Sequence, residues 1–206
     1  MPVIDFNAVA AQFQEGARAE RLARDPVAWV EERLGEHVWS KQREALASVI
    51  NNKRTMVASC HGSGKTWLAS RLIGWWLDTK DTAPTETRII TTAPSWNQVA
   101  NVMWGYVDEV RQKAGMPGNI TAKASWTFPG YKTPTAFGRK PSDYDESTFQ
   151  GIHATNVLVV VDEAGGVPES IFTSVEAITT NANARILAIA NPDDPNSYMA
   201  KVWREE

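Results

Sequence analysis

The stretch MVASCHGSGKTW, residues 56–67, decides the fold, because a short apolar run enters a loop of small residues and an apolar helical pattern leaves it. The loop follows the phosphate-binding pattern G-x-x-x-x-G-K-[ST], with Ser59 in place of the first glycine. Gly62 and Gly64 let backbone N–H groups converge on phosphate oxygens, and the helix that begins near Lys65 directs its positive end to the same place. A glycine-rich turn that matches by chance is the alternative, but the flanking strand and helix favour nucleotide binding.

The side chains at the end of this loop predict more specific contacts. Lys65 can reach the β- and γ-phosphates of a nucleoside triphosphate, and the Thr66 hydroxyl can bind Mg²⁺. We interpret Cys60, the chain's single cysteine, as a small residue that the loop requires rather than as a reactive thiol. The predicted nucleotide cradle consists of Ser59, Cys60, His61, Gly62, Ser63, Gly64, Lys65 and Thr66.

A second strong signal is Val157–Glu163, five apolar residues followed by two carboxylates. Such a run predicts a strand buried on both faces of a parallel sheet, and ligands of open α/β sheets bind at the carboxyl ends of the strands. Asp162 is then a candidate Mg²⁺ ligand, and Glu163 a candidate general base for an attacking water. An Asp-Glu helix cap is the alternative, and the pairing with the upstream phosphate loop disfavours it.

Two weaker signals flank these motifs. Gln42, one turn into a predicted helix, offers an amide donor and acceptor that match the N6 and N7 edge of adenine, and Trp39 can pack beside the base. An ordinary surface glutamine and a core tryptophan remain the alternative reading. Asn191 follows another buried strand and can hydrogen-bond water or phosphate, although Asn191-Pro192 is also a common turn.

Composition limits the classes of function. The 206 residues suit one α/β domain or one domain plus an appendage, and no stretch resembles a signal peptide or a membrane span. The net charge of −3 does not indicate DNA binding by bulk charge, so any DNA contact must be local or shared among copies. Most of the nine tryptophans are expected in the core or at interfaces, although an exposed one could stack on a base.

Hydrophobic periodicity predicts the remaining elements. We expect residues 1–24 to form a helical appendage and residues 25–206 to form the main domain. Asp25, Ser40 and Ser95 are predicted helix caps, and Pro129-Gly130 is a predicted hairpin turn. The wide apolar stripe of the helix over residues 65–78 predicts burial on more than one side. The helix after Ser95 has its apolar residues at helical spacing, namely Val99, Val102, Met103, Tyr106 and Val110. The predicted helices cover residues 5–24, 26–34, 40–50, 65–78, 95–110, 168–178 and 197–204, and the predicted strands cover 54–59, 87–92, 121–128, 134–137, 157–161 and 185–190.

With these pieces in order, the sequence resembles the ATPase domain of the large terminase subunit of tailed bacteriophages. The resemblance covers residues 25–192 and rests on several motifs in that family's order. They are Trp39-x-x-Gln42, Ser59–Thr66, Thr92-Ala93-Pro94-Ser95 with Gln98, Val159–Ala164 and Ala188-x-Ala190-Asn191-Pro192, with Phe149–His153 as an additional likeness.

The resemblance implies a RecA-like (ASCE) P-loop NTPase fold, with a mostly parallel central sheet flanked by helices, an N-terminal helical cap and an added β-hairpin. It implies hydrolysis of ATP with Mg²⁺ to drive double-stranded DNA into a procapsid. The implied partners are the portal protein, the small terminase subunit and further copies of the chain. We expect a homo-oligomeric ring, a pentamer when assembled and a monomer in isolation, without membrane association and in the bacterial host cytoplasm at the portal. The family's nuclease domain has no room after Glu206, so we expect an excised ATPase domain or a protein split from its nuclease.

The resemblance also assigns roles. Gln42 becomes the adenine reader, Lys65 the phosphate lysine, Thr66 and Asp162 the metal ligands, Glu163 the base and Asn191 the coupling residue. The generic motifs leave two alternatives open: a helicase-type DNA translocase, and a ring subunit that senses nucleotide without hydrolysing it. Glu163 argues against the second alternative, because binding alone does not need that carboxylate.

Two departures from the family pattern concern arginine. Many terminases have an arginine inside the phosphate loop, where this chain has His61, and Arg-Gly before the acidic strand, where this chain has Gln150-Gly151. An arginine finger contributes about 10³-fold or more to the rate. Arg139 is our candidate substitute, in a loop that could face the next subunit. The isolated domain is therefore expected to hydrolyse ATP slowly until it assembles.

Overall fold

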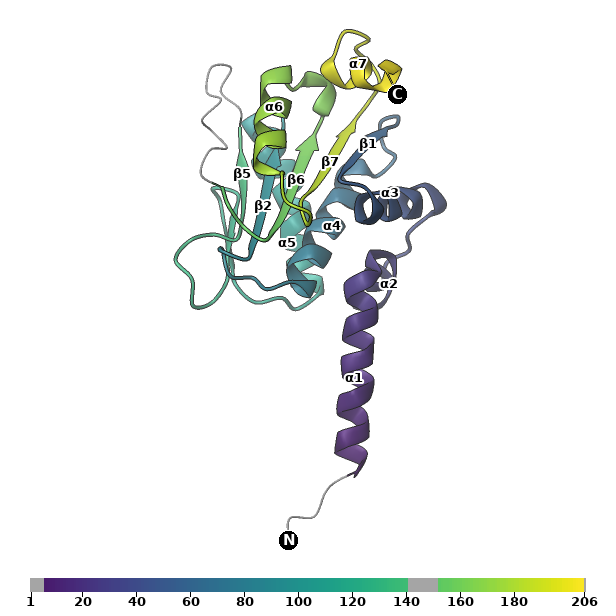
Figure 1. Ribbon diagram of the computed structural model, residues 1–206, viewed down its shortest axis with the longest axis vertical. Coiled ribbons are helices and arrows are strands. Elements are labelled where there is room, and N and C mark those ends of the chain that lie inside the picture. Colours follow the sequence, from purple (N-terminus) through teal and green to yellow (C-terminus); the bar gives the residue numbers. More distant parts are fainter. Residues whose placement is uncertain (1–5, 141–151, 206) are drawn as a thin grey trace.

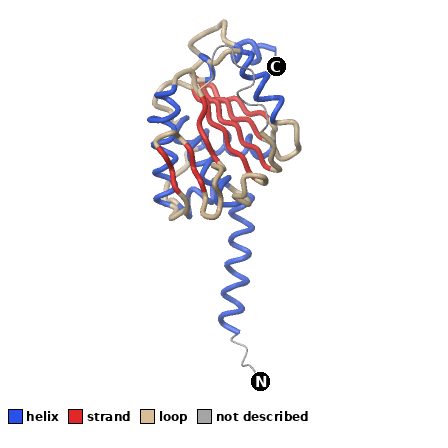
Figure 2. Tube along the Cα trace, turned by 90° about the vertical axis from the view of Figure 1, so that its left-hand side faces the viewer, coloured by secondary structure: helices blue, strands red, loops and turns tan. Residues whose placement is uncertain are grey.

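The computed structural model describes residues 6–140 and 152–205. They form a seven-stranded sheet in the order β1-β7-β6-β2-β5-β4-β3, with helices on both faces (Figures 1 and 2). The strands are β1 Arg54–Ala58, β2 Thr87–Thr92, β3 Asn119–Thr121, β4 Ser125–Thr127, β5 Ala136–Arg139, β6 Asn156–Asp162 and β7 Arg185–Ala190.

The first five strands of this order are parallel, and β4 and β3 extend the sheet antiparallel. Strand β7 lies between β1 and β6, so the carboxyl ends of these three parallel strands lie next to one another at one end of the sheet. This order places the phosphate-loop motif, the acidic pair and Asn191 together at the carboxyl end of the sheet.

The helices are α1 Phe6–Arg24, α2 Pro26–Arg33, α3 Ser40–Asn51, α4 Lys65–Thr79, α5 Trp104–Lys113, α6 Glu169–Ile178 and α7 Tyr198–Glu205. Strand β6 shows how they form two cores. Leu158 and Val160 face one apolar cluster with α2–α5, and Val157, Val159 and Val161 face the other with α6 and α7. The apolar run of β6 is therefore buried on both faces, as the sequence predicts.

Helix α4 carries the largest share of the core on its face of the sheet. Every residue from Leu68 to Leu77 is buried, which confirms that its wide apolar stripe packs on more than one side. Helix α1 projects from the body of the domain, and only its carboxyl-terminal end is anchored (Figure 1), where the Trp75 indole donates to the Leu22 carbonyl at 2.8 Å. No helix among the described residues is both long and apolar enough to cross a membrane.

Two predicted caps have clear outcomes. The Asp25 carboxylate accepts the Ala28 N–H at 3.0 Å before Pro26, which confirms Asp25 as the cap of α2. The prediction for α3 is wrong by one residue, because Trp39 occupies the N-cap position and Ser40 is the first helical residue. Gln42 then bonds back to the Trp39 N–H through Oε1 at 3.4 Å.

The predicted hairpin needs a correction. The sequence predicts one strand over residues 121–128, but a turn at Ala124, where φ is +51°, divides that region into β3 and β4. Strand β4 then pairs antiparallel with β5, which joins the main sheet parallel to β2. The hairpin around Pro129-Gly130 is confirmed as an addition to the main sheet. Gln150-Gly151 lies outside the described residues.

The helix after β2 also departs from the prediction. Residues Gln98–Met103 form a π-helical segment, whose wider turn shifts the helix register before α5. Val102 and Tyr106, expected on the apolar face, are therefore exposed, while Trp104 and Val107 are buried in their place.

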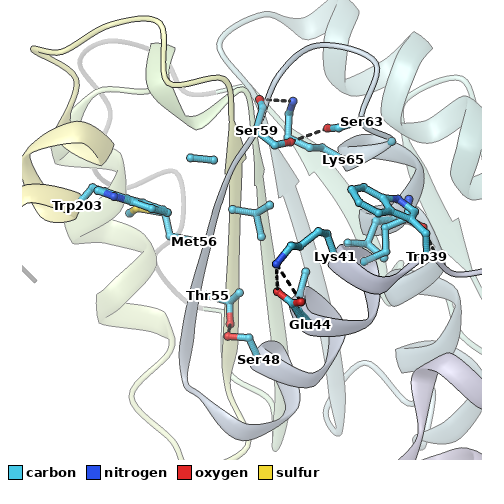
Figure 3. Close-up of a pocket in the computed structure, with 16 residues that line it drawn as sticks. Trp39, Lys41, Glu44, Ser48, Thr55, Met56, Ser59, Ser63, Lys65 and Trp203 are labelled. Carbon is cyan, nitrogen blue, oxygen red and sulfur yellow. Dashed lines mark hydrogen bonds and ion pairs between the residues drawn. The ribbon is translucent and has the colours of Figure 1, made fainter.

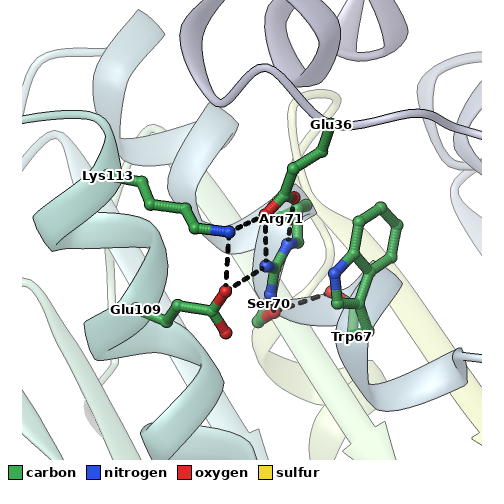
Figure 4. A network of polar contacts seen from close by, with 6 residues as sticks. All are labelled: Glu36, Trp67, Ser70, Arg71, Glu109 and Lys113. Carbon is green, nitrogen blue, oxygen red and sulfur yellow. Dashed lines mark hydrogen bonds and ion pairs between the residues drawn. The ribbon is translucent and has the colours of Figure 1, made fainter.

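A charge network centred on the buried Arg71 joins α4, α5 and the segment before α3 (Figure 4). The fully buried Arg71 guanidinium on α4 donates two hydrogen bonds to the Glu36 carboxylate, both at 2.8 Å, and a third to Glu109 at 3.1 Å. Lys113 also bonds Glu36 and Glu109. Burial alone would raise the pKa of Glu36, but Arg71 and Lys113 outweigh it and hold that pKa below its ordinary value.

Replacing Arg71 by methionine is expected to lower the free energy of unfolding by about 3 kcal/mol, because a mostly buried carboxylate loses its bidentate partner. The control is Arg111→Met, which removes a more exposed i,i+3 pair with Asp108 and should cost at most about 1 kcal/mol. Urea denaturation measures the free energy of unfolding of both variants.

The effect of Arg71→Met should also depend on pH. Because the pKa of Glu36 is lowered in the folded state, its ion pairs stabilise the fold fully above the ordinary carboxyl pKa, and this stabilisation is lost as the pH falls through the folded pKa. The wild-type advantage over Arg71→Met should therefore shrink in acid, and an equal cost for both variants would contradict this account.

Candidate active site

The loop between β1 and α4 adopts the conformation that the phosphate-binding pattern requires. Gly62 and Gly64 have φ angles of +73° and +81°, a region that side chains disfavour. A Cβ on Gly64 would lie 2.8 Å from Nε2 of Gln42, so the end of the Gln42 side chain reaches the loop at this glycine. The Ser59 hydroxyl, at the position of the pattern's first glycine, lies 2.5 Å from the Ser63 hydroxyl across the loop.

The Lys65 ammonium is the centre of the loop. It donates to the carbonyl oxygens of Ser59 and Cys60 at 2.9 and 2.7 Å, and to Oδ1 of Asn191 at 2.7 Å. The same Asn191 amide donates through Nδ2 to the His61 ring, whose Nε2 lies 2.7 Å away. The amide at the tip of β7 is therefore bonded to both the lysine and the histidine of the phosphate loop.

The predicted metal ligands also meet. The Thr66 hydroxyl donates to Oδ2 of Asp162 at 3.0 Å, although the two residues come from different strand–loop units. Asp162 is only 5% exposed, and burial raises the pKa of its carboxyl above the ordinary value, with the nearby Glu163 adding to this effect. The hydrogen bonds from Thr66 and from the Glu163 N–H, and the charge of Lys65, act in the opposite direction. A divalent cation would offset the cost of this buried charge.

Glu163 is positioned by its own backbone and by a partner that the sequence analysis missed. Its φ of +48° is uncommon for a non-glycine residue and turns the chain sharply after β6. The Gln98 amide donates to the Glu163 carboxylate. Gln98 is fixed in turn, because Oε1 accepts the Ser95 hydroxyl at 2.9 Å and the Ser95 N–H at 3.2 Å, while Ser95 Oγ accepts the Gln98 N–H at 3.2 Å.

This Ser-x-x-Gln arrangement is a capping box at the start of the helix, and it confirms Ser95 as a cap. The box leaves the amide nitrogen of Gln98 free to bond the carboxylate, and so fixes which way the amide points. The spacing of Ser95 and Gln98 could have predicted the box. The contact with Glu163 spans 65 positions of the chain, and no local pattern indicates it.

Two pockets share the loop. One, of about 220 Å³, is lined by the loop, the acidic pair and Asn191, with Tyr106 on its rim. The other, of about 330 Å³, is an apolar groove between β1 and α3 (Figure 3). Ser63, Gly64 and Lys65 line both, so a nucleotide whose phosphates bind the loop can extend to either side.

The remaining predicted residues divide between the groove and the surface. Gln42 and the half-exposed Trp39 line the groove, where the sequence places a base. Arg139 does not line either pocket. It lies at the end of β5, two strands from β6, with its guanidinium carbon 5.4 Å from the centre of the Phe137 ring. Among the described residues, no arginine lines the pocket that holds the acidic pair.

The sequence is similar to a curated relative. Over 80 residues it is 29% identical to a probable terminase large subunit of Enterobacteria phage P7. The match covers 39% of this chain and 15% of that protein. No family model matches the chain.

Solved structures extend the likeness to most of the chain. The HK97 bacteriophage large terminase aligns with a TM-score of 0.65 at 16% identity, over 89% of this chain and 40% of that one. The large terminase ATPase domain of Thermus phage P74-26 aligns with a TM-score of 0.56 at 22% identity, over 84% and 72%. The fold is that of a large terminase ATPase domain. A third neighbour, the large terminase of a thermophilic bacteriophage in complex with ADP, aligns with a TM-score of 0.58 at 15% identity, over 90% of this chain and 42% of that one.

The terminase-like fold confirms the predicted RecA-like fold class and the predicted resemblance, while the residue roles stay predictions. The chain spans less than half the length of the HK97 terminase and of the terminase solved with ADP. Their activities as whole proteins therefore enter only as proposals for this chain.

Because the Asp162 carboxylate is buried, Asp162→Asn is expected to raise the melting temperature in EDTA at pH 7 by about 2–4 °C, which corresponds to roughly 1 kcal/mol for a chain of this size. A raised folded pKa means that the group stabilises the fold below the ordinary carboxyl pKa and loses that contribution as the pH rises through the folded value. The difference in melting temperature between Asp162→Asn and wild type should therefore become smaller at acid pH. Differential scanning fluorimetry measures it, and Asp81→Asn, at an exposed carboxylate away from both pockets, is the control. A lower melting temperature for Asp162→Asn in EDTA would contradict the charge argument.

Proposed function

We propose that this chain hydrolyses ATP and that hydrolysis drives double-stranded DNA into a viral procapsid. One observation carries the proposal. A phosphate-loop lysine, a hydroxyl–carboxylate pair, a second carboxylate and the Asn191 amide converge on one pocket of about 220 Å³ at the carboxyl ends of β1, β7 and β6. A site that only binds nucleotide has no need of a positioned Glu163.

The chain's own residues account for each part of the reaction. Lys65 exchanges its carbonyl partners for oxygens of the β- and γ-phosphates, and the loop N–H groups hold the same phosphates. Glu163 accepts a proton from the water that attacks the γ-phosphorus, the bond to the β-phosphate oxygen breaks, and the products are ADP and inorganic phosphate. Gln98 keeps the Glu163 carboxylate at the rim of the pocket.

The Thr66 hydroxyl and the Asp162 carboxylate, 3.0 Å apart, suit Mg²⁺, which binds through one or two protein oxygens plus substrate phosphates. When bound, this ion neutralises charge on the phosphate oxygens. The raised pKa of Asp162 supports the assignment, because a cation there would stabilise a buried charge that its present partners compensate only in part. Gln42 and Trp39 hold the adenine in the groove on the other side of the loop.

Asn191 is proposed as the coupling residue. Its amide oxygen competes with phosphate for the Lys65 ammonium, so nucleotide binding would release Asn191 and the chain that follows β7. In this way nucleotide binding at the phosphate loop would change the position of the carboxyl-terminal segment.

The packaging role rests on the fold and on the sequence relative. We propose residues 25–206 as the ATPase domain and residues 1–24 as a helical appendage. The partners are double-stranded DNA, the portal protein, the small terminase subunit and further copies of the chain in a ring, expected to be a pentamer, in the host cytoplasm. Arg139, outside the pocket but at the same edge of the sheet, is proposed to act on the ATP of a neighbouring copy.

Glu163→Gln is expected to keep ATP affinity within about twofold and to lower the hydrolysis rate by about 10²-fold or more, because the amide cannot accept the proton. Lys65→Ala is the matched variant and should abolish ATP binding. Isothermal titration gives the affinities, and phosphate release gives the rates. Near-normal turnover by Glu163→Gln would remove its role as the base, and unchanged ATP affinity of Lys65→Ala would overturn the phosphate-loop assignment.

A further inference from the structure

The groove beside the phosphate loop has a wall that the sequence motifs do not include. Its floor is β1, from Thr55 to Ala58, and one wall is α3 with Trp39 and Gln42. The opposite wall is Trp203 of α7, close to the carboxyl-terminal end of the chain (Figure 3). The groove ends at Gly64 and Lys65, where the phosphates of a nucleotide would bind.

The chemistry of the groove suits a planar heterocycle. Most of its surface is apolar, with contributions from Met56, Val57 and Leu68. Its volume of about 330 Å³ lies within the range of small-molecule sites, roughly 300–1,000 Å³. Half of the lining residues are polar or charged, among them Gln42, whose amide can orient a base.

Trp203 is conspicuous among the tryptophans of this protein. Its exposed fraction is 57%, and Trp39 across the groove is 43% exposed, whereas Trp29, Trp75 and Trp126 are buried. An aromatic face left open at the mouth of an apolar groove is a stacking surface, and stacking on a base contributes about 1–3 kcal/mol.

The position of Trp203 is set by packing elsewhere on α7. Met199, one turn earlier on the same face, is buried in the core that contains α6. Tyr198 packs on Phe172 of α6 with ring centres 4.8 Å apart. These contacts anchor the start of α7, and the next turn carries the indole to the groove.

We propose that Trp203 is the second wall of the nucleobase site and stacks on the base of the nucleotide whose phosphates the loop holds. The proposal rests on ATP binding as proposed above. It adds that the segment following Asn191 touches both ends of the nucleotide: Asn191 at the phosphates and Trp203 at the base. Trp203 therefore distinguishes a nucleotide from a bare triphosphate.

The test compares the affinities for Mg·ATP and for inorganic triphosphate, measured by isothermal titration on the full chain. Trp203→Ala is expected to weaken ATP binding about tenfold and to leave triphosphate binding within about twofold of wild type. Trp203→Phe should restore most of the ATP affinity, because a phenyl ring also stacks. The control is Trp96→Ala, which removes a tryptophan of similar exposure that does not line the groove, and its ATP affinity should not change.

Each contrary outcome is distinct. Unchanged ATP affinity in Trp203→Ala would overturn the base contact. An equal loss for ATP and triphosphate would show that α7 supports the phosphate loop rather than the base, and would also overturn the proposal. If the wild-type chain binds neither Mg·ATP nor triphosphate, the proposed function itself is wrong. If the wild-type chain binds both ligands, the Trp203 variants test the base contact alone.

Discussion

The Lys65 ammonium is the interaction on which the rest of the site depends. It joins two carbonyl groups of its own loop to the amide at the tip of β7, so two distant segments of the chain meet at one charge. This contact is possible because β7 lies between β1 and β6 in the sheet. A phosphate that binds the loop competes for the same donor. The strand order therefore places Asn191 beside the phosphate loop, and the proposed coupling of nucleotide binding to the segment after β7 rests on this placement.

Placing the two carboxylates Asp162 and Glu163 in the site costs free energy. Asp162 is buried and its pKa is raised, and Glu163 sits next to it with a backbone angle that few side chains adopt. Both are fixed by polar partners, Thr66 and Gln98, that come from other parts of the chain. This positioning of two adjacent carboxylates supports the proposal that the pair takes part in hydrolysis.

Much of this arrangement could be predicted because the signals are local or strongly periodic. The glycines with positive φ, the all-apolar β6 and the residues at the strand ends follow from residue type and spacing, and so does the clustering of Lys65, Asp162 and Asn191. The register of the helix after β2 could not be predicted, since a π-helical segment breaks the 3.6-residue period. The bond between Gln98 and Glu163 depends on strand order, and the place of Trp203 depends on how Met199 and Tyr198 anchor α7. Helical spacing indicates which face of α7 is apolar, but not which groove that face meets.

The most direct test of the central claim, that this pocket hydrolyses ATP in concert with a neighbouring copy, is phosphate release from Mg·ATP as a function of protein concentration, with and without duplex DNA. We expect slow turnover per chain at low concentration and a steep rise as the chains assemble, because no arginine lines the acidic pocket among the described residues. Tight ATP binding without phosphate release at any concentration would contradict it and would make the chain a nucleotide sensor.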